Sequence, residues 1–297
     1  MNTTREAIDA ACAVLRDHGV QADRAEILQN ANTLVVRLND TLVARIVQHV
    51  GSPRNTTDWF ERENAIAAHL ARQNAPVIPL HPQLPPGPHL RNGFPMNFWE
   101  YVHCTDSPLD PWEAGRRLAL CHRALKTFTA PMPVLAILEE SRSVADRLES
   151  ESLMEPVSLA MLRRFLDRGL QSMARMDGQV LHGDAHLGNV LSTSRGLLWT
   201  DWEDAFVGPL EWDLASAIWN ARYLDADPDT EGNFLNGYRN EWGTFREDWL
   251  EHCAEARAAV ICVWYPLLYP HPDPNRRNKL QKRIEWLRDR EDTPGRV

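Results

Sequence analysis

One stretch near the middle of the chain, residues 181–204, limits the possible folds more than any other. Asp184 lies in a short polar loop, Asn189 follows five places later, and Asp201 ends the apolar run 196–200, which predicts a strand. A hairpin here would gather two carboxylates and an amide oxygen. Mg²⁺ takes oxygen ligands and is usually held by one or two carboxylates together with phosphates. The stretch therefore indicates a phosphate-bound cation at Asn189 and Asp201, and leaves Asp184 to orient and deprotonate an attacking hydroxyl.

The His-Gly-Asp triplet that ends at Asp184 and the Asp-Trp-Glu-Asp that begins at Asp201 resemble the catalytic and metal-binding loops of the kinase fold. Both forms are similar to the aminoglycoside phosphotransferase and choline-kinase-like branch rather than to protein kinases. The resemblance implies that Asp184 is the catalytic base and that Asn189 and Asp201 hold magnesium. It also implies that His186 contacts the transferred phosphate, because this residue falls where protein kinases carry a lysine. The implied cofactors are Mg²⁺ and ATP, with GTP not excluded.

The first hundred residues predict a small sheet with helices around it. Residues 2–18 space their apolar side chains at helical intervals. Two β-rich runs, 33–38 and 41–47, flank Asn39-Asp40, a dipeptide typical of hairpins. A helix is predicted over 57–73, with its apolar side facing inward.

The rest of the chain predicts mostly helices. After a strand at 98–102, helices are expected at about 111–126, 142–150, 156–176, 210–222, 231–240, 246–266 and 275–290. Together with the resemblance, this order predicts an α+β, two-lobed, protein-kinase-like fold. Residues 1–102 form the small β-rich N-lobe, which binds nucleotide. Residues 103–297 form the larger, mostly helical C-lobe, with the catalytic loop and the acceptor-binding helices.

In the fold that this chain resembles, the third strand carries a cationic side chain that binds the nucleotide phosphates. A glutamate from the following helix forms an ion pair with this cation. The matching stretch is Val-Ala-Arg-Ile, with Arg45 where protein kinases have lysine. No lysine precedes Lys126. Arginine stays charged and its planar fork binds phosphate bidentately. Glu63 is the expected partner, and Glu61 is the alternative.

Two further segments are assigned to nucleotide binding. The turn at 29–33 contains no glycine, although phosphate loops often use glycine for close backbone approach. Asn32 is expected to replace it, because asparagine tolerates left-handed backbone and its side chain can donate to phosphate. Glu100, Tyr101 and Val102 align with the segment whose backbone groups would pair with the adenine edge.

The charge distribution restricts the partners. The net charge is −9, and residues 201–255 hold 14 acidic residues against three arginines. Nucleic-acid binding requires a basic footprint, so nucleic acid is not expected as a partner. A cationic acceptor is compatible with this acidity, because carboxylates pair with ammonium groups and tryptophan faces attract cations. The expected acceptor contacts are Glu203, Asp204, Glu211 and Trp212.

The short interval from Asp201 to Asp213 leaves no room for a peptide-docking segment, which favours a small-molecule acceptor. Asp213 itself resembles the buried aspartate that braces the catalytic loop in kinases. The five cysteines are scattered, which predicts reduced thiols. No apolar run approaches membrane-spanning length and the first twenty residues do not resemble a signal peptide, so no membrane is expected and the predicted location is cytoplasmic. Either a monomer or a homodimer is expected.

The leading hypothesis is an ATP- and Mg²⁺-dependent O-phosphotransferase that acts on a hydroxyl of a small, cationic molecule. An aminoglycoside-type antibiotic or an amino-sugar fits this description. An antibiotic acceptor would give the protein a role in antibiotic resistance. Metabolic kinases of choline, homoserine or a sugar are the alternatives within the same class. The alternative from another class is a nucleotide-binding pseudokinase, which the glycine-free turn and Arg45 would motivate.

Overall fold

The computed structural model describes residues 2–30, 33–48 and 57–291. Its chain divides into two compact units. The N-terminal unit comprises Met1–Leu109, Arg123–Ala130 and Asn189–Asp204, and the C-terminal unit comprises Asp110–His122, Pro131–Gly188 and Ala205–Val297. The predicted N-lobe ended at residue 102 and was continuous, whereas the observed unit also takes in two later segments.

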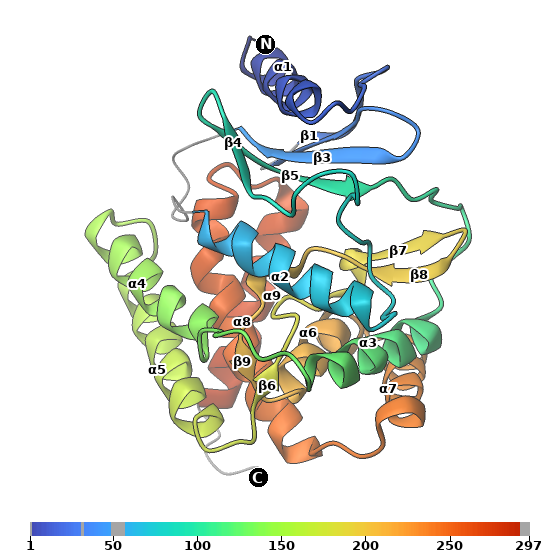
Figure 1. The fold of residues 1–297 in the computed structure, drawn as a ribbon. Helices are drawn as coiled ribbons and strands as arrows, with labels where there is room; N and C mark the ends of the chain where they lie inside the picture. The colour runs from blue at the N-terminus through green and yellow to red at the C-terminus, as the bar shows by residue number, and fades with distance from the viewer. Residues whose placement is uncertain (1, 31–32, 49–56, 292–297) are drawn as a thin grey trace. The chain divides into compact units, whose positions relative to one another are not determined.

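The N-terminal unit is built on a five-stranded antiparallel sheet with strand order β1-β2-β3-β5-β4 (Figure 1). The strands are β1 (Glu26–Asn30), β2 (Thr33–Arg37), β3 (Leu42–Val47), β4 (His89–Arg91) and β5 (Phe94–Glu100). The predicted hairpin at Asn39-Asp40 is confirmed, because β2 and β3 pair directly across this turn. The predicted strand at 98–102 is the end of the longer β5.

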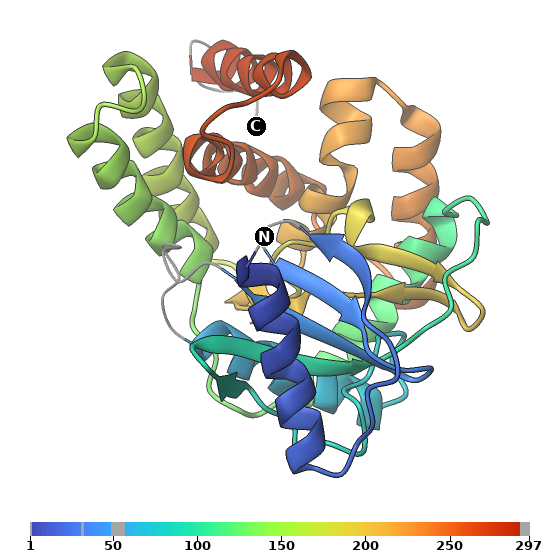
Figure 2. The same ribbon diagram turned by 90° about the horizontal axis from the view of Figure 1, so that it is seen from above.

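Alternation along β3 divides its side chains between two faces of the sheet. Leu42, Ala44 and Ile46 are fully buried, and they pack in one apolar cluster with residues of helix α1 (Asn2–Asp17). Arg45 therefore belongs to the opposite face. Helix α2 (Asp58–Arg72) covers that opposite face (Figures 1 and 2).

Helix α2 buries an apolar side that includes Phe60, Ile66 and Leu70, as its sequence pattern predicts. Glu63 lies among these residues and is only 2% exposed. A carboxylate in such surroundings requires a cationic partner. The Glu63 carboxylate therefore lies on the buried side of α2, which faces the sheet.

A second hairpin completes the N-terminal unit. Strands β7 (Val190–Thr193) and β8 (Gly196–Trp199) pair antiparallel, which confirms the strand predicted at 196–200. The buried Trp199 anchors this hairpin, because its backbone N–H donates to the Pro76 carbonyl oxygen at 2.9 Å. A short 3₁₀ helix, η2 (Trp202–Asp204), follows and packs against α2.

The C-terminal unit is mostly helical and is organised around α8, which packs against α4, α5, α6 and α9. Its helices are α3 (Pro111–Leu125, whose last turn belongs to the N-terminal unit), α4 (Ala136–Ser150), α5 (Pro156–Met173), α6 (Glu211–Trp219), α7 (Pro228–Trp242), α8 (Glu247–Leu268) and α9 (Pro274–Glu291). The short elements are β6 (Gln179–Val180), η1 (Leu187–Asn189), β9 (Val207–Gly208) and the π-helix η3 (Asn220–Asp225). Over the described part of the chain, none of these helices combines the length and the apolarity needed to cross a membrane.

Two glycines allow α3 and α7 to approach at backbone distance. A Cβ atom on Gly115 would overlap the Phe234 carbonyl oxygen, and one on Gly237 would overlap the Trp112 carbonyl oxygen. Neither glycine has positive φ, so these positions require glycine for space rather than for backbone conformation.

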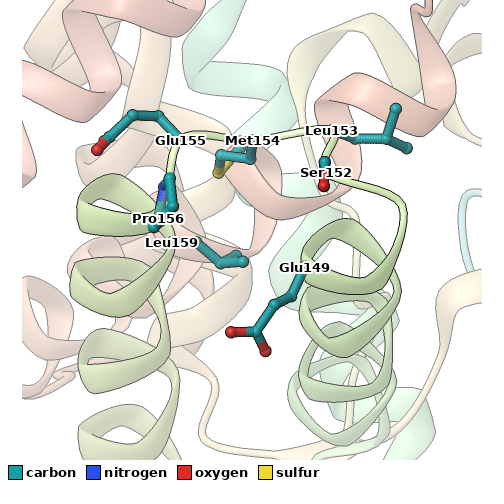
Figure 3. A pocket seen from close by; sticks show the side chains of 7 residues that line it. All are labelled: Glu149, Ser152, Leu153, Met154, Glu155, Pro156 and Leu159. Carbon is teal, nitrogen blue, oxygen red and sulfur yellow. The ribbon is translucent and has the colours of Figure 1, made fainter.

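A cavity of about 380 Å³ lies at the turn that joins α4 to α5 (Figure 3). The Glu149 carboxylate and the Leu159 side chain project into the space between the two helices. Glu155 caps α5 by accepting the backbone N–H groups of Val157 at 3.0 Å and Ser158 at 2.8 Å. None of the predicted site residues lines this cavity.

Candidate active site

The N-terminal unit contains a cluster of one cation and three carboxylates, which we call the Arg45 cluster: Arg45, Glu63, Asp201 and Glu203. Arg45 Nη1 donates to Glu63 Oε1 at 2.8 Å, and Nη2 lies 3.0 Å from Asp201 Oδ1. Nη2 also donates to Glu203 Oε2. The predicted pairing of Arg45 with Glu63 is confirmed, and Glu61 is not the partner.

Three elements bring the Arg45 cluster together. Strand β3 directs Arg45 away from the α1 core, and α2 supplies Glu63 from its inner side. The hairpin β7–β8 positions Asp201, which lies two residues after the end of β8 and has a left-handed backbone with φ of 68°. Such a backbone is uncommon for residues other than glycine and is often retained at functional sites.

Among the described residues, the Arg45 cluster sets one guanidinium against three carboxylates. Burial raises the pKa of Glu63 to about 7, although Arg45 opposes the effect. Burial also raises the pKa of Glu203 to about 8, with Asp201 adding to the shift and Arg45 again opposing it. Asp201 Oδ1 is buried and accepts no hydrogen bond from any residue that the structure describes. One guanidinium does not neutralise three carboxylates, so a further cation would fit here.

The donor set fits Mg²⁺ in particular. Asp201 offers Oδ1, which accepts no hydrogen bond within the described ranges, and the side chain of Asn189 contains an amide oxygen. Asn189 stands at the start of the same hairpin, where its carbonyl oxygen accepts the Thr200 N–H at 3.0 Å. Within the described ranges, no three Asp, Glu, His or Cys side chains form a complete metal site. This agrees with Mg²⁺, which is commonly held by one or two carboxylates and completes its shell with phosphate oxygens and water.

The segment predicted to meet adenine is partly engaged within the protein. The Glu100 N–H donates to the Pro79 carbonyl oxygen at 3.0 Å, and the Tyr101 N–H donates to the Thr41 carbonyl oxygen at 2.7 Å. If this segment contacts adenine, it does so through carbonyl oxygens or through the backbone of Val102. The adenine contact of these three residues stays a prediction.

The catalytic loop lies in the C-terminal unit and presents Asp184, whose side chain is 25% exposed. The guanidinium of Arg257, on α8, donates to Asp184 Oδ1. His186 Nε2 lies 3.5 Å from Asp184 Oδ2. His186 Nδ1 accepts the Gly188 N–H at 3.0 Å, so a neutral His186 ring carries its proton on Nε2. The contact with Arg257 was not predicted, because nothing near this residue in the sequence marks it.

The predicted brace of the catalytic loop by Asp213 is confirmed. Asp213 is fully buried in the first turn of α6, and it accepts the backbone N–H groups of His182 at 2.7 Å and Gly183 at 2.9 Å. Trp212 Nε1 donates to the Gly183 carbonyl oxygen at 2.8 Å. Helix α6 therefore fixes the backbone of the loop that carries Asp184.

This brace extends further into the C-terminal unit. His122 Nε2 lies 2.9 Å from Asp213 Oδ2, and His122 Nδ1 lies 2.8 Å from the Tyr238 hydroxyl oxygen. All three side chains are fully buried. The chain of polar contacts links the catalytic loop to α3 and α7.

The environment of Asp184 keeps it ionised. Burial alone would raise the pKa of Asp184, but Arg257, His186 and His182 together outweigh this effect and hold the pKa below its usual range. An ionised carboxylate accepts a hydrogen bond from a hydroxyl and can take up its proton. The loop is thus equipped to orient an alcohol.

The expected acceptor contacts require correction. Glu211 is only 3% exposed and accepts the Arg246 backbone N–H at 2.9 Å, and Trp212 is fully buried beneath the catalytic loop. Neither side chain presents surface to a ligand, and the hydrogen bonds of both stabilise the fold. Glu203 belongs to the Arg45 cluster. Acceptor contact at Glu203 and Asp204 stays a prediction.

The remaining predicted site residues are divided between the two units. Asn189 and Asp201 belong to the N-terminal unit, and Asp184 and His186 belong to the C-terminal unit. It stays a prediction that Asp184 meets the same bound ion as Asn189 and Asp201. Asn32 lies outside the described residues.

These local arrangements agree with the comparison to known families. The family model described as the phosphotransferase enzyme family matches residues 15–250. The chain belongs to the phosphotransferase enzyme family. As a member of this family, it is a phosphotransferase enzyme.

Solved structures show that this phosphotransferase has the protein-kinase-like fold. A choline/ethanolamine kinase family protein from Mesorhizobium loti matches with a TM-score of 0.70 and 16% identity, over 98% of this chain and 96% of that chain. An amicoumacin kinase in complex with AMP-PNP, Ca²⁺ and Ami has a TM-score of 0.70 and 14% identity, over 94% and 93%. A spectinomycin phosphotransferase in complex with ADP and spectinomycin has a TM-score of 0.62 and 14% identity, over 95% and 93%. No curated protein matches the phosphotransferase in sequence.

Proposed function

We propose that this phosphotransferase uses ATP and Mg²⁺ to phosphorylate a hydroxyl group of a small molecule. The observation that carries the proposal is the contact of the Arg45–Glu63 ion pair with Asp201 inside one compact unit. A kinase needs a buried, oriented cation next to a metal-binding carboxylate to receive nucleotide phosphates. The ionised, braced Asp184 supplies the complementary group for the acceptor.

In the proposed reaction, Asp184 accepts a hydrogen bond from the acceptor hydroxyl and takes its proton as the new P–O bond forms. The bond between the γ-phosphorus and the bridging oxygen breaks, and ADP leaves. Arg45 offsets charge on the nucleotide phosphates, and His186 Nε2–H donates toward the transferred group. Mg²⁺, bound by Asn189 and Asp201, would neutralise phosphate charge. Positioning and charge stabilisation, rather than proton transfer, supply most of the rate in this chemistry.

The acceptor is proposed to be small, because the chain between Asp201 and Asp213 has no segment for docking a peptide. Its charge is not indicated by the acidic composition of 201–255, since several of these acids are engaged within the protein. Glu231 and Glu251 both pair with Arg222, and Asp227 caps α7. A cationic antibiotic or amino-sugar therefore stays one member of the class to be tested. We also infer a cytoplasmic location, where ATP is available and the free cysteines stay reduced.

The test is ADP release from ATP in the presence of a panel of hydroxyl compounds: amino-sugars, macrolides, choline, homoserine and simple sugars. Transfer should require Mg²⁺, and Asp184→Asn should reduce it by about 10² or more while ATP binding persists. Near-full turnover by Asp184→Asn would refute the role of this residue. ATP binding without transfer to any hydroxyl compound would favour the pseudokinase.

A further inference from the structure

Two arginines are buried in the C-terminal unit, on adjacent helices. Arg257 on α8 is 9% exposed and Arg283 on α9 is 7% exposed. The Nε atoms of both side chains are buried and form no hydrogen bond with the described part of the chain. Burial of a guanidinium is unfavourable unless acceptors satisfy its charge and its donors. These two side chains therefore require a reason for their position.

Arg283 has no carboxylate partner among the residues that the structure describes. Its Nη1 donates to the Lys279 carbonyl oxygen and its Nη2 to Asn220 Oδ1, both at 3.3 Å. These are long bonds to neutral oxygens, weaker than the charge-assisted bonds that usually hold a buried arginine. Burial, together with the positive charge of Arg257, lowers the pKa of Arg283. Within the described ranges, only neutral oxygens thus accept hydrogen bonds from this buried cation.

Arg257 brings a fixed positive charge to the catalytic loop. Its guanidinium donates to Asp184 Oδ1 and lies 5.8 Å from the centre of the Trp212 ring. The other oxygen, Asp184 Oδ2, lies 3.5 Å from His186 Nε2. An acceptor with an ammonium group beside its hydroxyl would meet Arg257 at close range, which is unfavourable.

Among the described residues, Arg257 pairs with Asp184, whereas Arg283 has no carboxylate within 4 Å. Asn220, the neutral partner of Arg283, begins the π-helix Asn220–Asp225. π-helical turns are rare and occur frequently at functional sites. An unneutralised buried cation beside such a turn points to an anionic ligand.

We propose that the acceptor carries an anionic oxygen group, a carboxylate or a phosphate, that Arg283 binds while Arg257 holds Asp184 for the acceptor hydroxyl. This inference rests on the proposed function, because the same molecule is phosphorylated. An anionic group would replace the long bonds of Arg283 with charge-assisted ones. The acceptor is then an acidic alcohol rather than the cationic molecule that the sequence predicts.

The first test compares acceptors that share one carbon skeleton and differ in charge. Glycerol, glycerate, glycerol 3-phosphate and 3-amino-1,2-propanediol form one set, and glucose, glucuronate, glucose 6-phosphate and glucosamine form another. We expect kcat/KM for the acidic members to exceed that for the ammonium member by about tenfold or more, the range of a charged hydrogen bond. The carboxylate and phosphate members distinguish the two possible groups. A preference for the ammonium members would overturn the inference.

The second test removes the charge of Arg283 with Arg283→Gln. KM for acidic acceptors should rise by about tenfold or more, while kcat/KM for the neutral acceptor should change by about twofold or less. The matched control is Arg277→Gln, an exposed arginine on the same helix, which should change neither. Arg283→Lys keeps the charge but not the geometry of the guanidinium, so it should retain only part of the preference for acidic over neutral acceptors. This variant is measured in place of Arg283→Gln if the glutamine variant does not fold. An unchanged preference in the folded variant would refute the role of Arg283.

A binding measurement separates this inference from the proposed function. Glycerate and glycerol 3-phosphate should raise the thermal midpoint of the wild-type protein, and Arg283→Gln should lose that shift. If no acceptor is phosphorylated, the proposed function fails, and the acid-specific shift still supports an anion site. Equal shifts from the acids and from 3-amino-1,2-propanediol, or none from any of them, would count against the anion site even if transfer occurs.

Discussion

Arg257 forms an ion pair with Asp184, which lies 73 positions earlier in the sequence. The pair joins the central helix α8 to the catalytic loop. It gives the proposed base a fixed direction, because the guanidinium holds one of its carboxylate oxygens. It also sets the pH range in which the base is ionised.

Removal of Arg257 should move the acidic limb of the pH–rate profile. Asp184 is active when ionised, and Arg257 helps to hold the pKa of Asp184 below its usual range. The wild-type enzyme should therefore keep activity at mildly acidic pH and lose it as the pH falls through this low pKa. In Arg257→Gln, the same loss should begin about 1–3 pH units higher. Measurement of kcat/KM against pH with a neutral acceptor checks this, with Arg257→Lys as the charge-retaining control.

Asp201→Asn should abolish the effect of magnesium on nucleotide binding. Asparagine tolerates the left-handed backbone at this position, so the substitution removes the charge without straining the turn. Titration of the protein with ATP, with and without Mg²⁺, measures the effect. The wild-type protein should bind more tightly with the metal, whereas the variant should show about the same affinity in both conditions. A persisting magnesium effect would exclude Asp201 as a ligand.

Glu63→Gln should impair the use of ATP, because it removes the partner of a buried arginine. We expect kcat/KM for ATP to fall by about tenfold or more, the range for loss of a charge-assisted hydrogen bond. Glu61→Gln is the matched control, since Glu61 lies two residues away on the same helix and lines a surface groove instead. Steady-state kinetics of both variants provide the comparison. Similar losses in the two would argue against the specific ion pair.

Gly237→Ala should destabilise the C-terminal unit, because the added methyl group overlaps the Trp112 carbonyl oxygen. A cost of about 1–3 kcal/mol or more is expected from overpacking. Gly232→Ala, on the same helix, meets no atom within 4 Å and should be neutral, or stabilising by about 0.4–1 kcal/mol. Thermal unfolding of both variants measures the difference. A stable Gly237→Ala protein would show that α3 and α7 can move apart without cost.

The sequence predicts the long elements well because their periodicity is strong. Each predicted helix is present, although the helix predicted over 142–150 begins earlier, at Ala136, and the one over 210–222 continues as a π-helix beyond Trp219. The strands at Glu26–Asn30 and Gln179–Val180 were not predicted. The first is exposed along its whole length and the second has only two residues, so neither produces a readable alternation.

Site residues were predictable where a motif fixes their spacing, and not elsewhere. Arg45 and Glu63 could be paired because the resemblance to the kinase fold assigns a cation to the third strand and a glutamate to the following helix. Arg257 and Arg283 could not be found, since helical arginines in a charged sequence are usually exposed and only tertiary packing buries these two. Glu211 and Trp212 were misassigned for the converse reason. Their acidic and aromatic character suggested ligand contact, but packing under the catalytic loop decided their role.

The brace at Asp213 limits how the catalytic loop can move. Among the described residues, its carboxylate faces backbone N–H groups and His122, and no lysine or arginine approaches within 4 Å to share its charge. Opening the loop while α6 stays in place would leave the buried Asp213 carboxylate without its two backbone hydrogen-bond donors. The loop and the start of α6 should therefore exchange their amide hydrogens together, as a single cooperative segment.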